Sequence, residues 1–247
     1  MASSRRAKRR REMTAGTDIV ATADIAARLG AVRDRIAQAC DRAQRDIESV
    51  RLVLASKTQP AAAVAAAYAA GARDFGENYV QEALAKRAAL AHLRDVYWHL
   101  IGHLQTNKAR TAATNFDLIH TLDDVRLAHA IARVHPAPPM PMLIEVNLGG
   151  EATKSGVGPG AVEALIESVR DAVDVRGLMT IPPPADNPLA ARRWFTELRK
   201  LRDRLEAATG LALPELSMGM TEDYEIAIEE GATIVRVGRA VFGERLR

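Results

Sequence analysis

A lysine at the end of a predicted buried strand is the first residue in this chain whose type and position suggest chemistry. Lys57 follows the apolar residues 52–55, and Pro60 with the alanine-rich segment after it predicts the start of a helix. Only six of the 34 basic residues are lysines. A lysine kept in so arginine-rich a chain suggests a need for an amine, which can form an imine with an aldehyde when it is partly buried. An ordinary solvated loop lysine is the alternative.

Two glycine-containing turns near the C-terminus suggest a site for phosphate. Ser217 and Gly219 precede a predicted helix that begins at Thr221, and Gly238 and Arg239 follow the last predicted strand. A hydroxyl, a glycine and a helix start together can bind phosphate, although each glycine could simply permit a tight turn. An amine and a phosphate site on adjacent strands require a ligand with a carbonyl group and a phosphate. Pyridoxal phosphate and a sugar phosphate substrate of an aldolase are the two candidates.

The elements that would position these residues alternate regularly along the chain. One long helical pattern covers residues 17–49, and helical patterns then separate eight strands. Those strands are predicted at residues 52–55, 72–75, 96–101, 116–120, 142–148, 173–179, 213–216 and 233–237. Strict alternation implies a parallel sheet, and eight units in about 200 residues fit a single α/β domain, a (β/α)8 TIM barrel with an extra N-terminal helix. An open doubly wound sheet is the alternative, but its usual nucleotide-binding glycine motifs are missing.

Composition and charge limit the remaining possibilities. The 247 residues are 48% hydrophobic and 26% charged, and the net charge of +3 rests partly on the basic residues 5–11. We interpret residues 1–16 as a disordered basic leader rather than a nucleic-acid-binding arm, and residues 17–247 as the barrel domain. No apolar run approaches the roughly 18 residues that span a bilayer. Cys40 is the only cysteine, and no secretory signal is recognisable, so a cytoplasmic protein is expected.

Seven short stretches carry a resemblance to a known family, in order along the chain. They are residues 55–58 (ASKT), 75–79 (FGENY), 98–105 (WHLIGHLQ), 154–156 (KSG), 176–179 (RGLM), 216–220 (LSMGM) and 235–238 (VRVG). With these motifs the chain resembles the pyridoxal phosphate homeostasis proteins, which are single-barrel relatives of the alanine racemase N-terminal domain. The resemblance implies a cofactor, pyridoxal 5'-phosphate (PLP), and a role in intracellular vitamin B6 homeostasis.

The resemblance also implies a set of cofactor-binding residues. Lys57 would hold PLP as a Schiff base, Arg236 would lie near the pyridine nitrogen, and Asn78 would line the pocket. The phosphate would be held by Ser217, Gly238 and the backbone amide of Arg239, with Met218 and Gly219 in the same binding loop. Members of the family usually carry a small Thr or Ser at the position of Arg239. A hydroxyl contact to the phosphate is therefore lost there, and the direction of the arginine side chain is left open.

Arg236 suits binding, or at most racemisation. An arginine cannot accept the pyridinium proton, so the ring would be a weak electron sink. We therefore expect a PLP carrier or buffer with no catalytic residues; a PLP-dependent amino-acid racemase is the alternative. Racemases of this type need a second base from a C-terminal β-domain, and the chain ends at Arg247. We expect a monomer that passes PLP to PLP-dependent enzymes, with no nucleic-acid or membrane partner.

No metal site is expected either. His99 and His103 are four residues apart, but Gly102 lies between them and no glutamate follows His99, so a zinc-binding helix is not indicated.

Overall fold

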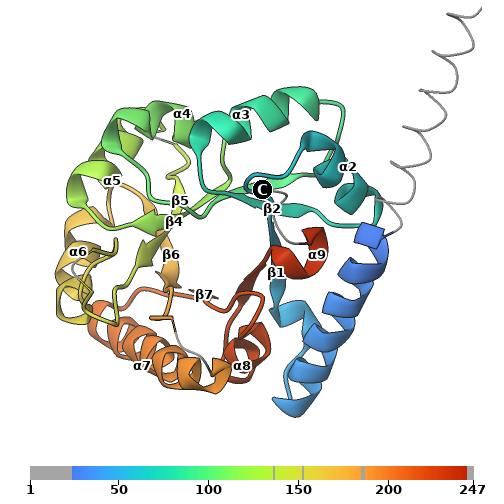
Figure 1. Ribbon diagram of the computed structural model, residues 1–247. Helices are drawn as coiled ribbons and strands as arrows, with labels where there is room; N and C mark the ends of the chain where they lie inside the picture. Colours follow the sequence, from blue (N-terminus) through green and yellow to red (C-terminus); the bar gives the residue numbers. More distant parts are fainter. Residues whose placement is uncertain (1–23, 136, 152, 185–186, 244–247) are drawn as a thin grey trace, which may run out of the picture.

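Eight parallel strands form a closed barrel in which each strand pairs with the next and β8 pairs with β1. The computed structural model describes residues 24–135, 137–151, 153–184 and 187–243 (Figure 1). The strands are β1 (Arg51–Ala55), β2 (Asp74–Glu77), β3 (Tyr97–Leu100), β4 (Leu118–Leu122), β5 (Pro141–Glu145), β6 (Asp174–Met179), β7 (Glu215–Ser217) and β8 (Ile234–Val237). The predicted (β/α)8 barrel is therefore confirmed over the open sheet. The leader predicted at residues 1–16 lies outside the described residues.

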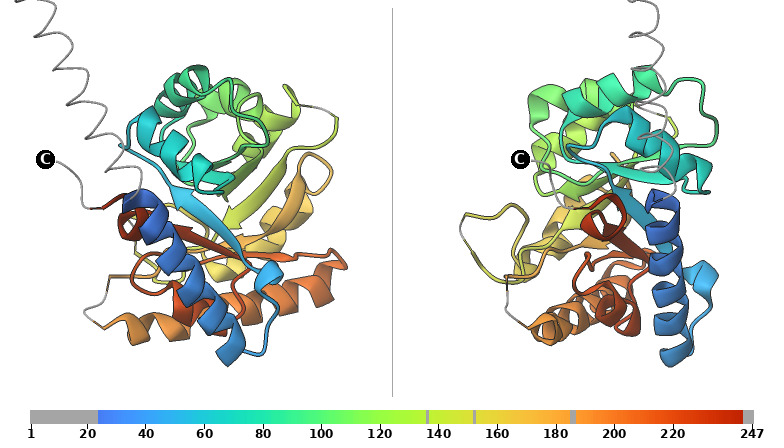
Figure 2. Two further views of the ribbon diagram at one scale, coloured as in Figure 1. Left: turned by 90° about the vertical axis from the view of Figure 1, so that its right-hand side faces the viewer. Right: turned by 45° about the vertical axis from the view of Figure 1, so that its right-hand side comes forward.

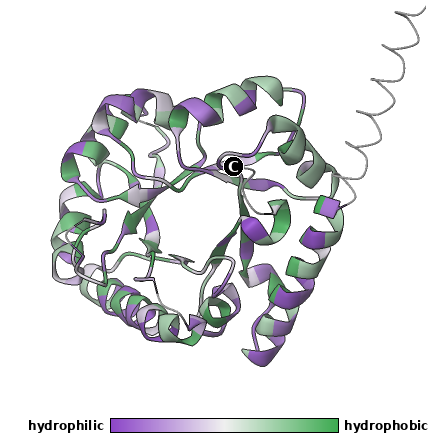
Figure 3. Ribbon diagram, viewed as in Figure 1, coloured by the Kyte–Doolittle hydropathy of each residue, from purple (hydrophilic) through white to green (hydrophobic). Residues whose placement is uncertain are grey.

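Helices surround the barrel on its outside (Figures 1 and 2). They are α2 (Ala61–Ala69), α3 (Val80–Ala89), α4 (Ala109–Ala113), α5 (Val125–Ala132), α6 (Val162–Val169), α7 (Arg192–Thr209), α8 (Tyr224–Glu229) and α9 (Arg239–Phe242), with short 3-10 turns at Ile47–Ser49, Thr106–Lys108, Pro159–Ala161 and Pro188–Ala191. Hydrophobic and hydrophilic residues alternate along these helices, as amphipathic packing requires (Figure 3). Within the described part of the chain, no helix has the length and apolarity needed to cross a bilayer.

The extra N-terminal helix is present but ends earlier than predicted. Its described part covers residues 24–42 rather than continuing to residue 49. The chain turns after it, because Gln44 has a φ of 53° and the side chain of Asp46 accepts a hydrogen bond from the backbone of Glu48. The helix packs beside α8, where Arg35 and Arg42 donate to Glu225. It therefore covers the outside of the last barrel unit.

Three strands, β2, β4 and β7, lie further along the chain than predicted, and β4 spans residues 118–122 rather than 116–120. The second strand was expected to end at residue 75, but β2 includes Gly76 and Glu77, because Gly76 pairs with both Ala55 and His99. The seventh strand was expected to end at Leu216, but β7 includes Ser217, which pairs with Met179 and Ile234. Side chains alternate across a strand, so this one residue decides which way the Ser217 hydroxyl points.

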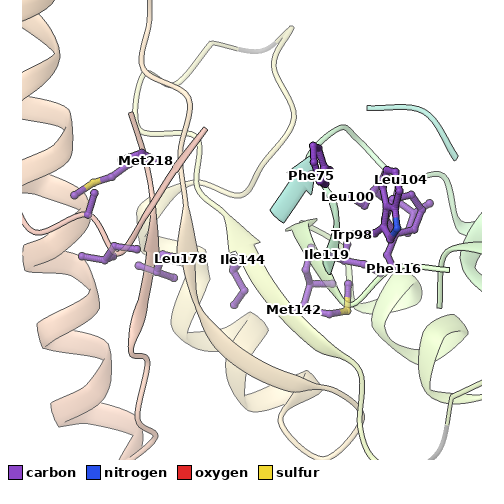
Figure 4. Close-up of a cluster of buried hydrophobic side chains, with 14 of the residues drawn as sticks. Phe75, Trp98, Leu100, Leu104, Phe116, Ile119, Met142, Ile144, Leu178 and Met218 are labelled. Carbon is purple, nitrogen blue, oxygen red and sulfur yellow. The ribbon is translucent and has the colours of Figure 1, made fainter. Parts of the chain in front are cut away.

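The side chains of the strands point to one of two apolar layers, one outside the barrel wall and one inside it. The larger core lies between the strands and the helices, and Figure 4 shows part of it, including Phe75, Trp98 and Leu100. A smaller cluster fills the inside of the barrel and consists of Val53, Leu118, Leu143, Met179 and Ile234. Residues two positions further along the same strands also point inward. On β4 and β8 these residues are His120 and Arg236, and both are buried, so a polar layer lies above the apolar one.

Candidate functional site

A cavity of about 670 Å³ opens at the carboxyl ends of the strands. Its wall comes from the loops after β1, β2, β3, β5, β6, β7 and β8 and includes Lys57, Asn78, Ile101, Pro183, Thr221 and Arg239. The loops at this end of a (β/α)8 barrel hold the functional residues, because the strands all deliver their carboxyl ends to the same face. Its volume suits a small cofactor or substrate.

Five of the eight predicted cofactor-binding residues line this cavity. They are Lys57, Asn78, Arg236, Gly238 and Arg239. Lys57 is half-buried after β1, and Arg236 lies on β8, whose backbone pairs Arg236 with Val53 of β1. A Cβ atom added at Gly238 would lie 3.0 Å from the backbone oxygen of Ala55. The lysine loop and the last glycine turn are thus held next to each other.

The other three predicted residues lie behind the cavity wall. Met218 is fully buried in the core between strands and helices. Gly219 has a φ of +89°, and an added Cβ would lie 2.5 Å from the Cβ of Ala227, so the close approach of α8 explains this glycine. Ser217 is fully buried and its hydroxyl takes part in hydrogen bonds inside the barrel. In this loop Thr221 is the hydroxyl-bearing residue that lines the cavity.

The Ser217 hydroxyl belongs to a chain of hydrogen bonds that crosses the barrel interior. Nη1 of Arg236 lies 2.6 Å from Oγ of Ser217, which lies 2.9 Å from Nδ1 of His120. Nε2 of His120 lies 2.9 Å from Nδ1 of His99. Nε2 of His99 lies 3.0 Å from Oδ1 of Asp74 at the start of β2. The chain therefore joins the cavity to the opposite end of the barrel.

With neutral imidazole rings, the carboxylate of Asp74 fixes the direction of the hydrogen bonds back along this chain to Ser217. A guanidinium can only donate and a carboxylate can only accept. Arg236 therefore donates to Ser217, Ser217 to His120, His120 to His99, and His99 to Asp74. Both imidazoles are neutral in this arrangement, each with its proton on Nε2. Burial lowers the pKa of His99 and lowers that of His120 further, in agreement with neutral rings.

Arg236 stays a cation at the bottom of the cavity. Burial lowers its pKa to about 10, and the carboxylates of Asp223 and Glu145 oppose this shift. Its second amino group donates to the backbone oxygen of Thr180 at 3.0 Å. Both contacts hold the guanidinium in one orientation. A cation so fixed can donate a hydrogen bond to a ligand but cannot accept a proton from it.

Glu145 is an acidic group beside this polar layer. Burial raises its pKa to about 7, the charge of Asp123 adds to the shift, and Arg236 opposes it. Its Oε2 is buried and has no hydrogen-bond partner in the described residues. Glu145 does not line the cavity, so it acts on the site through its charge near Arg236.

The direction of the Arg239 side chain is now visible. Its Nη2 lies 3.0 Å from Oε1 of Glu222, and both side chains are largely exposed. Both residues line the cavity. Lys154 also lines it, and its Nζ lies 2.5 Å from Oε2 of Glu151. The two cations that reach the cavity from its rim are therefore paired with carboxylates.

The donors of the wall fit an anionic aromatic aldehyde such as PLP. Lys57 supplies an amine, Arg236 a fixed cation, and Thr221 a hydroxyl. The Oδ1 atom of Asn78 is buried without a hydrogen-bond partner in the part of the chain that is described. A buried polar atom without a partner is uncommon in a folded protein, and a bound ligand would explain it. The residues present therefore fit the cofactor that the sequence suggests.

Several residues that shape the site were not singled out from the sequence. His99 was considered only as a metal ligand, and His120 and Asp74 were read only as parts of strands. The sequence signal that could have found them is a polar residue at an inward-facing position of an otherwise apolar strand. This signal can be recognised once the ends of the strands are known. Lys86 and Glu77 were missed as well. A buried ion pair between α3 and β2 leaves no local sequence pattern.

Known proteins match most of the chain. Residues 28–246 match the family model described as alanine racemase, N-terminal domain. The pyridoxal phosphate homeostasis protein of Aquifex aeolicus is 47% identical over 222 residues, covering 88% of this chain and 97% of the relative. The protein of the same name from Pseudomonas aeruginosa is 46% identical over 225 residues, covering 90% and 96%.

A solved structure agrees with these matches. PipY of Synechococcus elongatus with PLP bound has a TM-score of 0.78 and 40% sequence identity, and the match covers 89% of this chain and 100% of that chain. At this identity the match supports both the barrel and the family assignment.

Proposed function

The chain belongs to the alanine racemase N-terminal domain family, and on that premise we propose that it binds PLP and takes part in PLP homeostasis without catalytic turnover. The observation that carries the proposal is the meeting of Lys57 and Arg236 in one cavity on the adjacent strands β1 and β8. Relatives named pyridoxal phosphate homeostasis proteins and the PLP-bound PipY structure support it.

Each residue of the wall has a distinct role in this proposal. When bound, PLP supplies an aldehyde that reacts with primary amines and a pyridine ring that withdraws electrons. Lys57 would add its amine nitrogen to the aldehyde carbon, with water as the leaving group. Arg236 would face the ring nitrogen as a hydrogen-bond donor. Gly238, the backbone amide of Arg239 and the hydroxyl of Thr221 would bind the phosphate, and Asn78 would lie beside the ring.

The fixed cation at Arg236 favours a carrier over an enzyme. The guanidinium donates to Ser217 and to the backbone of Thr180, and it stays protonated at neutral pH. Without a proton on the ring nitrogen, the ring stabilises a carbanion poorly. The cytoplasmic location, the monomeric state and the transfer of PLP to PLP-dependent enzymes stay predictions of the sequence.

A spectral titration tests the proposal. Purified protein mixed with PLP should develop an absorption band near the edge of the visible range, and borohydride should fix the cofactor to the peptide that contains Lys57. Lys57→Ala should abolish both signals, whereas Lys200→Ala, at an exposed lysine of α7, should leave them unchanged. A wild-type protein that stays colourless with added PLP would exclude PLP binding. Rapid interconversion of L- and D-alanine by the loaded protein would instead favour a racemase.

A further inference from the structure

A buried cluster of charges lies directly behind the loop that carries Lys57. Lys86 of α3 has a side chain only 6% exposed, and its Nζ lies 2.7 Å from Oε1 of Glu77 and 2.7 Å from Oε1 of Glu82. The Glu77 side chain is fully buried at the end of β2. We call Lys86, Glu77 and Glu82 the Lys86 cluster. It does not line the cavity, and the proposed function gives it no role.

The Lys86 cluster holds the backbone on both sides of Lys57. Before Lys57, Nζ of Lys86 donates to the backbone oxygen of Ser56 at 2.5 Å. The Ser56 hydroxyl donates to Oε1 of Glu77 at 2.6 Å. After Lys57, the backbone N–H of Thr58 donates to Oε1 of Glu82. The two residues that flank Lys57 are therefore both held by one set of ion-paired side chains.

The backbone that the cluster holds is strained. Thr58 has a φ of 65°, in the left-handed region that β-branched residues rarely adopt. Such a conformation is unfavourable and persists only where the surroundings over-determine it. The hydrogen bond from Thr58 to Glu82 is one such constraint, and Glu82 is itself held by Lys86. The Ser56 carbonyl and the Thr58 N–H belong to the two peptide planes that flank Lys57, so the contacts to Lys86 and Glu82 set the direction in which the lysine side chain leaves the loop.

Stability alone is a weak explanation for these buried charges. Burial raises the pKa of Glu77, and the hydrogen bonds from Lys86 and Ser56 only oppose this shift. Replacing a buried ion pair by well-packed apolar residues is often neutral or even stabilising. What an apolar replacement cannot supply is a hydrogen-bond donor to the Ser56 carbonyl and an acceptor for the Thr58 amide. The contacts to the Lys57 loop therefore favour a positional role.

We propose that the Lys86 cluster positions the Lys57 amine, with Lys86 as the residue on which the arrangement depends. The proposal rests on the proposed function in naming PLP as the aldehyde that Lys57 meets. It concerns the geometry of the loop before any cofactor binds. The cofactor-free protein can therefore test it.

The test compares two variants that remove the central cation. Lys86→Met keeps the length of the side chain, and Lys86→Met/Glu77→Gln also removes the buried negative charge. In cofactor-free protein, acetaldehyde with cyanoborohydride alkylates accessible amines, and peptide mass spectrometry gives the rate at Lys57 relative to exposed Lys200. We expect this ratio to change at least about threefold in both variants and the rate of PLP attachment to fall about tenfold, since small misplacements of a reacting group cost that much.

Controls separate positioning from general destabilisation. Val169→Ala removes two methyl groups from a fully buried residue of α6, on the side of the barrel away from β1 (Figure 1). It should lower stability and leave unchanged the rate of alkylation at Lys57 relative to Lys200, which we call the Lys57 ratio. Should the Lys86 variants fail to fold, Glu82→Gln keeps Lys86 and Glu77, weakens the acceptor of the Thr58 amide and its ion pair with Lys86, and should shift the ratio in the same direction.

The positional role and the proposed function would be contradicted by different results. An unchanged Lys57 ratio and an unchanged PLP rate in folded Lys86→Met/Glu77→Gln would overturn the positional role. If wild-type protein does not attach PLP at all, the proposed function fails, but the alkylation ratio still decides whether the Lys86 cluster positions Lys57.

Discussion

The guanidinium of Arg236 donates to the hydroxyl of Ser217 at 2.6 Å, inside the barrel and below the cavity. This contact gives Ser217 a structural role, because its oxygen accepts from Arg236 while its proton is directed to His120. In the loop after β7, the hydroxyl that a ligand in the cavity could contact is then that of Thr221, which lies four residues after Ser217 and lines the cavity. The two hydroxyls can be separated by experiment.

Ser217→Ala should reduce stability, and Thr221→Val should reduce PLP affinity. Removing the Ser217 hydroxyl leaves buried groups of Arg236 and His120 without their partner, which costs about 1–3 kcal/mol of unfolding free energy. Thr221 is half-buried, so Thr221→Val should change the unfolding free energy by less than about 1 kcal/mol while weakening PLP binding roughly tenfold. Denaturant unfolding and PLP titration of both variants give the two quantities. Normal stability with weak PLP binding in Ser217→Ala would show instead that Ser217 contacts the phosphate.

The histidine pair should make folding sensitive to mild acid. The pKa values of both imidazoles lie below the ordinary value of 6.5 in the folded protein. The unfolded chain therefore binds protons first, and stability present above pH 6.5 is lost as the pH falls below it. The loss is at most about 1.4 kcal/mol per pH unit for each ring that stays neutral.

A matched variant isolates this contribution. Glu145 acts in the opposite direction, because its folded pKa of about 7 lies above the ordinary 4.5 and favours folding as the pH falls. The measure is therefore the difference between wild type and His120→Gln in denaturant unfolding from pH 8 to pH 5. The variant should start less stable at pH 8 and lose less on acidification. Parallel curves would mean that His120 is not a buried neutral group.

The ion pair between Arg239 and Glu222 should affect PLP affinity through the balance of charge at the cavity rim. Arg239 pairs with Glu222 at the cavity rim, so Arg239→Thr leaves an unpaired carboxylate near the proposed phosphate site. We expect PLP binding to weaken about threefold to fivefold, with little change in stability because exposed ion pairs contribute roughly 1 kcal/mol or less.

The double variant Arg239→Thr/Glu222→Gln decides how Arg239 acts. It restores the balance of charge and should recover most of the PLP affinity, measured by titration at low and high salt. If the double variant binds PLP as weakly as Arg239→Thr, the arginine itself contacts the phosphate.

Local sequence patterns were sufficient for the architecture. Alternating apolar strands and amphipathic helices depend on neighbouring residues, so their number and order could be read directly, and a closed parallel barrel followed. Lys57, Arg236 and Gly238 could be placed for the same reason, since each lies at or just after the end of a recognisable strand and the strand ends share one face.

Pairing between distant segments determined the rest. Ser217 became an inward strand residue because it pairs with Met179 and Ile234, and no local signal marks that pairing. The chain from Arg236 to Asp74 joins five strands, and the Lys86 cluster joins a helix to a strand and a loop. Side-chain direction alternates with every residue of a strand, so an error of one residue in a boundary reverses a role. The sequence of this protein therefore indicates which residues lie near the cavity, and the folded barrel separates those that line it from those that are buried behind its wall.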